Sequence, residues 1–430
     1  MLPELRTSIP GPESLRLSER LRRVESRNVT FLSSDFPIFW ERAEGVNVWD
    51  VDGNRFLDWS SAFAVAGLGH RNEAIGQALS GQAERLLHGM GDVHPPALKV
   101  ELLERLSQMT YERWGLGPAK SVLSSSGFEA VETALKTAVL ATGKPGVVTF
   151  EGGYHGLGYG TLGAGSFPKF ARPFAKQLGS WGQRVPFPCC PDELTAVRAE
   201  LTLALQSGEV GAILVEPIQG RGGVRIPPAG FLGMLREVAD AFGAVLIYDE
   251  IFVGFHRTGR LFACEWEAPA YPDLLCVGKA LTGGFPLSAC IGRSEIMDAW
   301  PESDGEALHT STFLGHPLGC AMALAALSQH ADGSVRSLVG ERGRKLEASL
   351  RAADLPVKEI RGRGLLWGIE CQQALGPIAS GALARGLIAL GGGETGRVLE
   401  LVPPFAIGDE EIDYSIAQLK ELLLQASDEG

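Results

Sequence analysis

The sequence predicts an α/β protein whose larger domain is built on a mostly parallel β-sheet with helices on both faces. Short apolar strands alternate with amphipathic helices between about residues 120 and 290, the pattern of a sheet covered on both sides. From about residue 330 the pattern changes to α+β, and 430 residues are enough for two or three domains. We therefore expect an N-terminal arm over residues 1–35. A small α+β domain formed by both termini should cover 36–75 and 330–430, and a large domain should cover 76–329.

Local patterns predict the individual elements in turn. Residues 46–59 alternate apolar and polar side chains around an Asp-Gly turn, which predicts a β-hairpin. Strands of the larger domain are expected in "KSVLSSSG", "GVVTF", "GAILVE", "AVLIYD", "LLCVG" and "PLSACI". Helical spacing of apolar residues predicts helices in "FEAVETALKTAVLA", 191–207 and 230–242. The C-terminal part should hold a helix at 341–353, strands through "VKEIRGRGLLWGIEC" and a closing helix within 409–424.

The composition argues against several classes of protein. A formal charge of −12 disfavours a general binder of nucleic acid or of an anionic membrane, because either needs a basic surface. No apolar run approaches the roughly 18 residues of a membrane-spanning helix, and the first residues lack the apolar stretch of a signal peptide. The seven cysteines include no C-x-x-C pair, which favours a reduced, cytoplasmic protein. The eight histidines show no metal-ligand spacing, so no metal is expected.

Two predicted strands run into ionisable side chains. "VLIYDE" ends on the adjacent acids Asp249 and Glu250, and "LLCVGK" ends on Lys279. The turns "SSSG" and "EGGYHG" also follow predicted strands. Because ligands of open α/β sheets bind beyond the carboxyl ends of the strands, these groups are expected to converge on one site although they lie far apart in sequence.

These residue types suit one cofactor. A lysine amine can form a Schiff base with an aldehyde, and a carboxylate can keep a pyridine nitrogen protonated. A helix that begins at Ser126 and Gly127 offers free N–H groups and a positive dipole end to a phosphate. An aromatic ring from "GGYHG" could stack on the cofactor ring. The sequence therefore predicts a pocket for pyridoxal 5'-phosphate.

Nine motifs extend this interpretation to a family. In chain order they are "VWDVDGNRFLDW", "GLGH", "SSSGFEAVETALK", "YHG", "VEPIQG", "LIYDEIFVGFHRTGR", "VGKALTGGFPLSA", "STFLGHPLGCA" and "VLELVPPF". In these motifs the sequence resembles the class III pyridoxal-phosphate aminotransferases, the family of 4-aminobutyrate, acetylornithine and ω-amino acid aminotransferases, over about residues 35–425. The resemblance implies the fold-type-I architecture of pyridoxal-phosphate transferases.

The resemblance also implies roles for individual residues. Lys279 matches the lysine that forms the Schiff base and shuttles the proton, Asp249 the acid at the pyridinium nitrogen, and Tyr154 the ring that stacks on the cofactor. The expected reaction is a ping-pong transfer of an amino group from an amine or ω-amino acid donor to an oxo acid acceptor. Glu250 is expected to be structural. Glu216 and Gln219 are open candidates for lining the pocket, and His155 is an open candidate for a hydrogen bond nearby.

The phosphate site implied by the resemblance involves two subunits. The backbone of Gly127 and Phe128, with Ser126 nearby, matches the phosphate-holding segment of the family. Thr312 matches the threonine that reaches the phosphate of the neighbouring subunit's cofactor. A homodimer with shared active sites is therefore expected.

Departures from the family pattern concern the substrate. Phe252 stands where many relatives have a glutamine that binds the cofactor's ring oxygen. Arg221 stands in place of a glutamate and Glu400 in place of a carboxylate-binding arginine, so both charges are exchanged. The two residues either pair with reversed polarity or contact substrate, with Glu400 facing a cationic group and Arg221 a carboxylate. We expect a preference other than plain 4-aminobutyrate or ornithine, and Phe63 is an apolar candidate for the substrate pocket.

Two other functions compete with the aminotransferase. An aminomutase or racemase of the same family would need no added oxo acid. A non-catalytic cofactor-binding protein is disfavoured because both Lys279 and Asp249 are present. A dinucleotide enzyme is disfavoured because no G-x-G-x-x-G follows a predicted strand.

Overall fold

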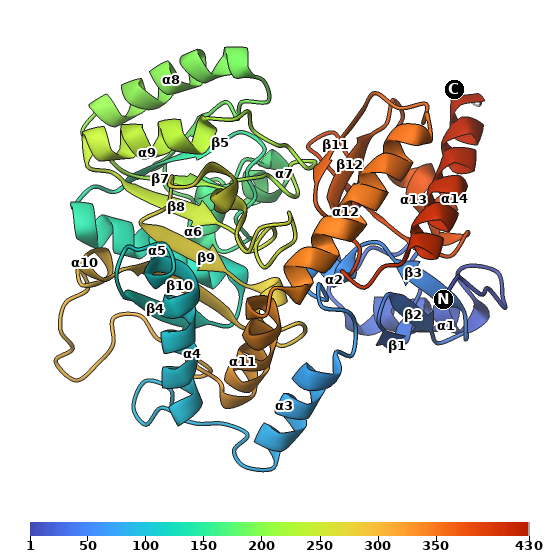
Figure 1. The fold of residues 1–430 in the computed structure, drawn as a ribbon, viewed down its shortest axis with the longest axis horizontal. Helices are drawn as coiled ribbons and strands as arrows, with labels where there is room; N and C mark the ends of the chain where they lie inside the picture. The colour runs from blue at the N-terminus through green and yellow to red at the C-terminus, as the bar shows by residue number, and fades with distance from the viewer. Residues whose placement is uncertain (429–430) are drawn as a thin grey trace. The chain divides into compact units, whose positions relative to one another are not determined.

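The computed structural model describes residues 1–428 (Figure 1). The chain forms two compact units, Met1–Asn72 with Ser337–Gly430, and Glu73–Arg336. The first unit, which includes the predicted arm, is built from both ends of the chain, and the second is continuous in sequence. No helix in the described part of the chain is both long and apolar enough to span a lipid bilayer.

The unit Glu73–Arg336 is built on a seven-stranded sheet. Its strands, in spatial order, are β4 (Ala119–Ser124), β10 (Ser288–Arg293), β9 (Leu274–Val277), β8 (Val245–Asp249), β7 (Val210–Val215), β5 (Gly146–Phe150) and β6 (Gly182–Val185). The neighbours from β9 to β6 pair in parallel, and only β10 runs antiparallel to the strands beside it. The prediction of a mostly parallel sheet is confirmed.

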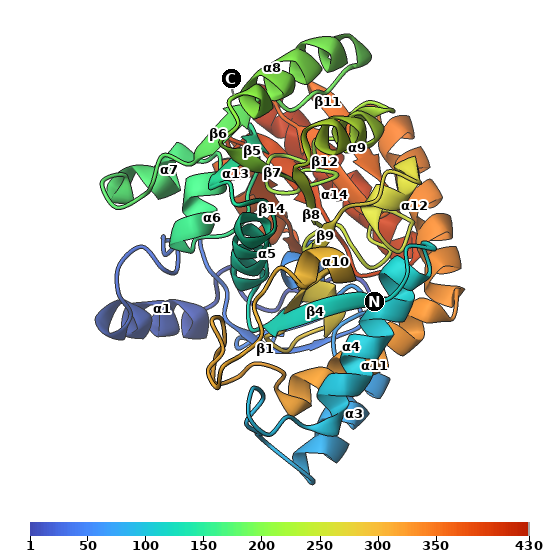
Figure 2. The same ribbon diagram turned by 90° about the vertical axis from the view of Figure 1, so that its left-hand side faces the viewer.

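Alternate side chains of the central strands enter two different apolar clusters. Val148 and Leu246 pack with Phe231 and Leu235 of α9 (Phe231–Phe242), whereas the adjacent Val147 and Ile247 pack with α5 (Gly127–Thr142). Successive residues of a strand point to opposite faces, so both faces of this sheet are buried. Figure 2 shows α8 (Leu194–Gln206) and α9 on one side of these strands and α5 on the other.

The remaining helices of this unit are short or peripheral to the sheet centre. They are α3 (Glu73–Ala83), α4 (Ala97–Ser107), α6 (Tyr159–Ala164), α7 (Pro168–Ala171), α10 (Ser294–Met297) and α11 (Pro317–Ala331). Single helical turns occur at η1 (Gln108–Glu112), η2 (Arg172–Phe174), η3 (Pro191–Glu193), η4 (Ala263–Glu267) and η5 (Lys279–Leu281). The turn η5 begins directly after β9 and carries the predicted cofactor lysine.

The other unit contains two four-stranded sheets. One has the order β1 (Trp40–Glu44), β2 (Asn47–Asp50), β3 (Arg55–Asp58) and β13 (Leu387–Ile388), and the other β11 (Glu359–Arg363), β12 (Leu366–Glu370), β15 (Val398–Leu401) and β14 (Leu390–Gly392). The predicted hairpin is confirmed as β2 and β3, which pair antiparallel. The helices are α1 (Pro12–Val24), α2 (Ser61–Ala64), α12 (Ser334–Ala352), α13 (Leu375–Leu383) and α14 (Asp409–Asp428).

The N-terminal residues are bound to the hairpin of their own unit. Glu4 and Arg55 form an isolated antiparallel bridge. The carboxylate of Asp52, in the hairpin turn, accepts hydrogen bonds from the backbone N–H groups of Glu13 and Ser14 at 2.7 and 2.9 Å. This carboxylate satisfies free donors in the first turn of α1, where a negative charge is also favourable.

Candidate active site

The predicted cofactor residues of the unit Glu73–Arg336 lie at the carboxyl ends of its strands. Asp249 is the last residue of β8, and Lys279 follows the neighbouring strand β9 by two residues. Ile251 connects this edge to the start of α5, because a methyl group added to Gly127 would lie 3.0 Å from its side chain. A methyl group added to Gly278 would lie 3.4 Å from the same side chain. The acid, the lysine-bearing turn and the helix N-terminus therefore lie around one residue.

Asp249 is buried, with 5% of its surface exposed, and both carboxylate oxygens have partners. Oδ1 accepts the backbone N–H of Ile251 at 3.1 Å, and Oδ2 lies 2.9 Å from Nδ1 of His155. Such a carboxylate has a fixed orientation, which suits a group that must face one ring nitrogen. His155 comes from the turn after β5, so the contact joins strand ends that are 94 residues apart.

Two acids, Asp249 and Glu216, act on the pKa of His155. Burial opposes the charged imidazolium, but the hydrogen bond and charge of Asp249 and the charge of Glu216 outweigh it, so the pKa of His155 is raised. Glu216 is itself 5% exposed, and burial raises its pKa to about 7. Burial destabilises a carboxylate more than a neutral carboxyl group, and Asp249 adds like-charge repulsion.

Glu216 binds the backbone of two loops at this edge. Its carboxylate accepts the N–H of Tyr154 at 2.8 Å and the N–H of Gly220 at 3.0 Å. It therefore fixes the turn that carries the predicted stacking ring against the loop that carries Arg221. Sequence reasoning left Glu216 and His155 as open candidates, and the signal that would have found them is the position of Glu216 directly after β7 and of His155 in the turn after β5.

Lys279 lies in a strained backbone conformation beside an aromatic ring. Its φ of 45° is in the left-handed region, which is uncommon for a residue other than glycine and clusters at functional sites. Its Nζ lies 4.8 Å from the centroid of the Phe252 ring. The residue that departs from the family pattern therefore contacts the predicted reactive amine directly.

The start of α5 has the features of an anion site. Glu129 accepts the backbone N–H groups of Ser125 and Ser126 at 3.0 and 2.8 Å and the hydroxyl of Ser126 at 2.9 Å, and the carbonyl of Ser126 accepts the N–H of Ala130 at 3.3 Å. The hydroxyl of Ser288 donates to the carbonyl of Ser126 at 2.5 Å and fixes this turn. The N–H groups of Gly127 and Phe128 belong to the first helical turn, where no intrahelical acceptor exists. They are free to hold a phosphate.

The other predicted residues are placed less directly. The Tyr154 ring packs against two phenylalanine rings, and Thr312 is exposed on the turn before α11. Glu400 and Phe63 belong to the other unit, so their part in the site stays a prediction. Phe63 is 61% exposed within four consecutive residues of positive φ, and Glu400 is 8% exposed on β15.

Glu250 is fully buried and binds two backbone N–H groups of η4, which supports its structural interpretation.

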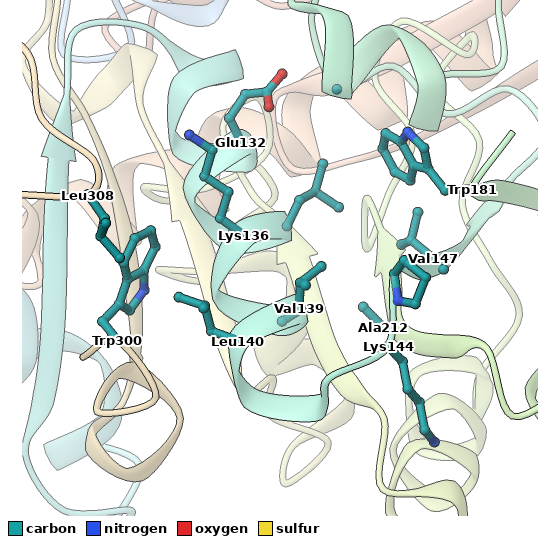
Figure 3. Close-up of a pocket in the computed structure, with 15 residues that line it drawn as sticks. Glu132, Lys136, Val139, Leu140, Lys144, Val147, Trp181, Ala212, Trp300 and Leu308 are labelled. Carbon is teal, nitrogen blue, oxygen red and sulfur yellow. The ribbon is translucent and has the colours of Figure 1, made fainter. Parts of the chain in front are cut away.

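A separate cavity of about 470 Å³ lies away from these residues (Figure 3). It is bordered by the outer side of α5, including Val139 and Leu140, and by the indole rings of Trp181 and Trp300. None of the residues predicted for the cofactor or the substrate lines it. This cavity is therefore not the predicted chemical site.

A buried carboxylate, a lysine just after the next strand and a free helix N-terminus are the groups that a pyridoxal-phosphate enzyme needs. The profile of the Aminotransferase class-III family matches residues 31–423. The chain is 36% identical to the acetylornithine aminotransferase of Methanopyrus kandleri, over 91% of this chain and 95% of that protein. It is 37% identical to the 4-aminobutyrate aminotransferase of Mycobacterium tuberculosis, over 94% of each.

The fold comparison agrees with the sequence comparison. An ornithine aminotransferase structure from Toxoplasma gondii, described with partial occupancy of pyridoxal phosphate at its active site, superposes with a TM-score of 0.84. It is 28% identical, over 96% of this chain and 95% of that chain. The chain therefore belongs to the class III aminotransferase family, with the fold-type-I architecture and the pyridoxal-phosphate dependence of that family. The comparisons do not favour the aminomutase, racemase or non-catalytic alternatives.

Proposed function

We propose that this aminotransferase uses Lys279 and Asp249 as its catalytic pair and acts by a ping-pong mechanism on an amine or ω-amino acid donor and an oxo acid acceptor. The observation that carries this proposal is the position of the two residues at adjacent strand ends, with Asp249 buried and held by His155. When bound, pyridoxal phosphate accepts the electron pair that remains after the substrate loses its proton.

Lys279 would supply the amine that holds the cofactor's aldehyde, and its Nζ would remove and return the substrate proton. A positioned general base contributes about 10²–10⁴-fold in rate. Asp249 would face the ring nitrogen, where a carboxylate favours the protonated ring. Tyr154 would pack against the ring face, while the N–H groups of Gly127 and Phe128 and the nearby Ser126 would hold the phosphate.

Replacement of the lysine tests this assignment. After borohydride reduction, the wild type should carry the cofactor as a mass adduct on the peptide that contains residue 279, and Lys279→Ala should not. The turnover rate of Lys279→Ala should fall at least about 10²-fold. Lys120→Ala is the matched control, because Lys120 is an exposed residue of β4 that pairs with Asp298. An adduct that persists in Lys279→Ala would contradict the assignment.

We also propose that the enzyme is a cytoplasmic homodimer in which Thr312 contacts the phosphate of the partner's cofactor. Complementation tests this arrangement. In a mixed dimer of Lys279→Ala and Thr312→Ala subunits, one site would combine an intact Lys279 with an intact Thr312 from the other chain. Mixing should therefore restore the cofactor affinity of that site. If Thr312 acted within its own chain, no site would be restored and the affinity would stay at the Thr312→Ala value.

The substrate proposal concerns the exchanged charges. The names of the two relatives give acetylornithine and 4-aminobutyrate as their substrates. In this chain Arg221 and Glu400 carry the opposite charges to the family pattern at their positions. We propose that the preferred donor is neither plain 4-aminobutyrate nor ornithine. Donor panels measured with the wild type and with Glu400→Arg test this, and an unchanged order of donors would contradict a substrate role for Glu400.

A further inference from the structure

Thr312 lies in an exposed segment that has a histidine at each end. Residues 309–316, which we call the Thr312 segment, contain no helix or strand and lead directly into α11. His309 is the first residue of this segment and His316 the last. The position of the exposed Thr312 hydroxyl therefore depends on the contacts that hold the two ends.

His309 binds the start of the Thr312 segment to α5. Its Nε2 lies 3.1 Å from Oγ1 of Thr133, and its Nδ1 lies 3.0 Å from Nζ of Lys136. The Thr133 hydroxyl donates to the carbonyl of Glu129, so it accepts its other hydrogen bond from Nε2. A lysine ammonium can only donate, so Nδ1 accepts from Lys136. The imidazole therefore makes both contacts only in its neutral form.

His316 binds the other end of the segment to α11. It is the N-cap residue of that helix, and its Nδ1 accepts the backbone N–H of Leu318 at 3.3 Å. Pro317 has no N–H group, so Leu318 supplies the first backbone donor of the helix. The half-buried imidazole lies within a cluster of rings at centroid distances of 5.0, 5.5 and 6.0 Å, those of Phe285, His88 and Phe313.

Protonation would break one hydrogen bond at each end of the segment. An imidazolium has two N–H donors and no acceptor nitrogen, so it cannot accept from Lys136 or from Leu318. At His309 the new charge would face the ammonium of Lys136. At His316 it would stand at the positive end of the α11 dipole. Each protonated histidine would therefore repel the group that it now binds.

The surroundings of His309 favour its neutral form. Burial, followed by the charge of Lys136, lowers the pKa of His309 from its ordinary 6.5. The charges of Glu129 and Glu132 act in the opposite direction without outweighing these effects. A lowered pKa means that the contact is fully present above pH 6.5 and is lost as the pH falls through the folded value.

The pKa of His316 is also lowered from 6.5, by burial and then by the charge of His88. Lys99 of α4 lies beside the same end of the segment, because a methyl group added to Gly315 would lie 2.8 Å from its side chain. Its Nζ donates to the carbonyl of Gly91 at 2.7 Å. The two ends of the Thr312 segment therefore respond to acid in the same direction.

A third contact of the segment does not depend on a histidine. The hydroxyl of Thr310 donates to Oδ2 of Asp92 at 2.6 Å, and this hydrogen bond lowers the pKa of the Asp92 carboxyl group. Asp92 therefore stays charged in mildly acid solution. The segment should stay attached to the protein there while its two ends are released.

We infer that His309 and His316 are positioning residues for Thr312, because as neutral imidazoles they hold the Thr312 segment where Thr312 can contact the cofactor phosphate of the partner subunit. Their protonation weakens that contact, so the enzyme loses cofactor affinity in mildly acid solution. This inference rests on the proposed homodimer with a shared phosphate site.

The test follows cofactor affinity with pH. Pyridoxal phosphate is titrated into the full-length apoprotein between pH 8 and pH 5, monitored by fluorescence, for the wild type and for the double variant His309→Asn/His316→Asn. An asparagine amide keeps an acceptor oxygen and does not titrate. Acid should raise the dissociation constant about 3- to 10-fold more in the wild type than in the double variant, within the range that a helix cap contributes. Groups at the cofactor titrate in both proteins and cancel in this comparison.

Two further variants show whether the effect belongs to these histidines and acts through Thr312. His94→Asn is the matched control, because His94 is an exposed histidine close in sequence to Asp92, and it should follow the wild type. In a Thr312→Ala background, the two histidine replacements should leave the pH dependence unchanged. Hydrogen exchange of the holoenzyme gives a second measurement. After correction for the intrinsic rate, the peptide 309–318 should lose protection at pH 5 in the wild type and keep it in the double variant.

Equal pH dependence of cofactor affinity in the wild type and the double variant would overturn the inference. A difference that persists in the Thr312→Ala background would also overturn it, because the histidines would then act by another route. Both results leave the shared phosphate site itself intact. Thr312→Ala with wild-type affinity at pH 8 would instead contradict that proposed site, and the inference with it.

Discussion

The imidazole of His155 and the carboxylate of Asp249 form a buried pair, with Nδ1 2.9 Å from Oδ2. His155 is 3% exposed and Asp249 5%, so water does not compete for this contact. The pair joins the turn after β5 to the end of β8. Asp249 therefore keeps one orientation before any cofactor binds, which lowers the ordering cost of binding.

Removal of the imidazole should weaken cofactor binding. His155→Ala leaves Oδ2 of Asp249 without its partner, and hydrogen bonds to charged groups contribute about 1.5–3 kcal/mol. We expect the dissociation constant of pyridoxal phosphate to rise about 10- to 100-fold in titrations of the apoprotein, monitored by fluorescence. His155→Asn can place an amide N–H near the Nδ1 position and should recover part of the affinity. Equal affinities of the two variants would show that the hydrogen bond does not position Asp249.

Glu250 should stabilise the fold and not the chemistry. Its two oxygens accept the N–H groups of Ala263 and Cys264 at 2.6 and 2.7 Å in the interior. Glu250→Ala leaves both donors buried without an acceptor, which should lower the free energy of unfolding by about 2–5 kcal/mol in urea titrations. Glu250→Gln keeps one acceptor oxygen and should lose less. A Glu250→Ala protein that unfolds at the same urea concentration as the wild type would contradict this role.

Glu250 should also make the free energy of unfolding depend on pH. Burial raises the pKa of Glu250 from its ordinary 4.5 to about 7. The folded state then binds more protons than the unfolded state between these two values, so stability from this group is present below pH 4.5 and is lost as the pH rises through 7. The difference in unfolding free energy between wild type and Glu250→Gln should shrink over this window by up to about 1.4 kcal/mol per pH unit. A constant difference would refute the assignment.

His330 should have the opposite effect. Burial, followed by the neighbouring His256, lowers its pKa from 6.5 to about 3. The folded state binds fewer protons than the unfolded state in this window, so the stabilisation is present above pH 6.5 and is lost as the pH falls toward 3. Thermal unfolding between pH 4 and 7 should show a smaller acid loss in His330→Asn than in the wild type. His88→Asn is the control, because His88 is exposed, and it should follow the wild type.

The side chain of Glu400 should leave no room for a residue larger than glycine at position 392. A methyl group on Gly392 would lie 1.7 Å from Oε1 of Glu400, on the adjacent strand. Gly392→Ala should cost about 1–3 kcal/mol of stability by overpacking, and the double variant with Glu400→Ala should recover much of that loss. Gly376→Ala has open space around it and should be neutral or slightly stabilising. Additive effects of the Gly392 and Glu400 changes would show that the side chain lies elsewhere.

Regular patterns made most of the fold predictable, and two deviations have physical causes. The helix expected at 341–353 begins earlier, at Ser334. The sequence pattern missed its first half because Gly340 and Gly343 have a low helix propensity. A methyl group on Gly343 would lie 2.9 Å from the carbonyl oxygen of Gly364, so a close tertiary contact explains this glycine. The antiparallel direction of β10 could not be predicted, because strand direction depends on the connection and not on the strand's own residues.

The sequence by itself determined which side chains stand at strand ends, because strand periodicity and turn residues are local properties. It placed Asp249 at the end of β8 and Lys279 just after β9, and it identified the start of α5. It left the choice between Asp249 and Glu250 to the family resemblance. The structure gives the physical reason, since successive residues point in opposite directions and Glu250 binds the backbone of η4.

Only the tertiary structure decided which distant residues meet. The contact of His155 with Asp249 spans 94 residues, and it exists because β5, β7 and β8 are consecutive in the sheet. The position of Arg221 on the Tyr154 and Phe170 rings likewise depends on a loop held by Gln219. Such contacts arise from strand order and loop closure, which no local pattern of the sequence encodes.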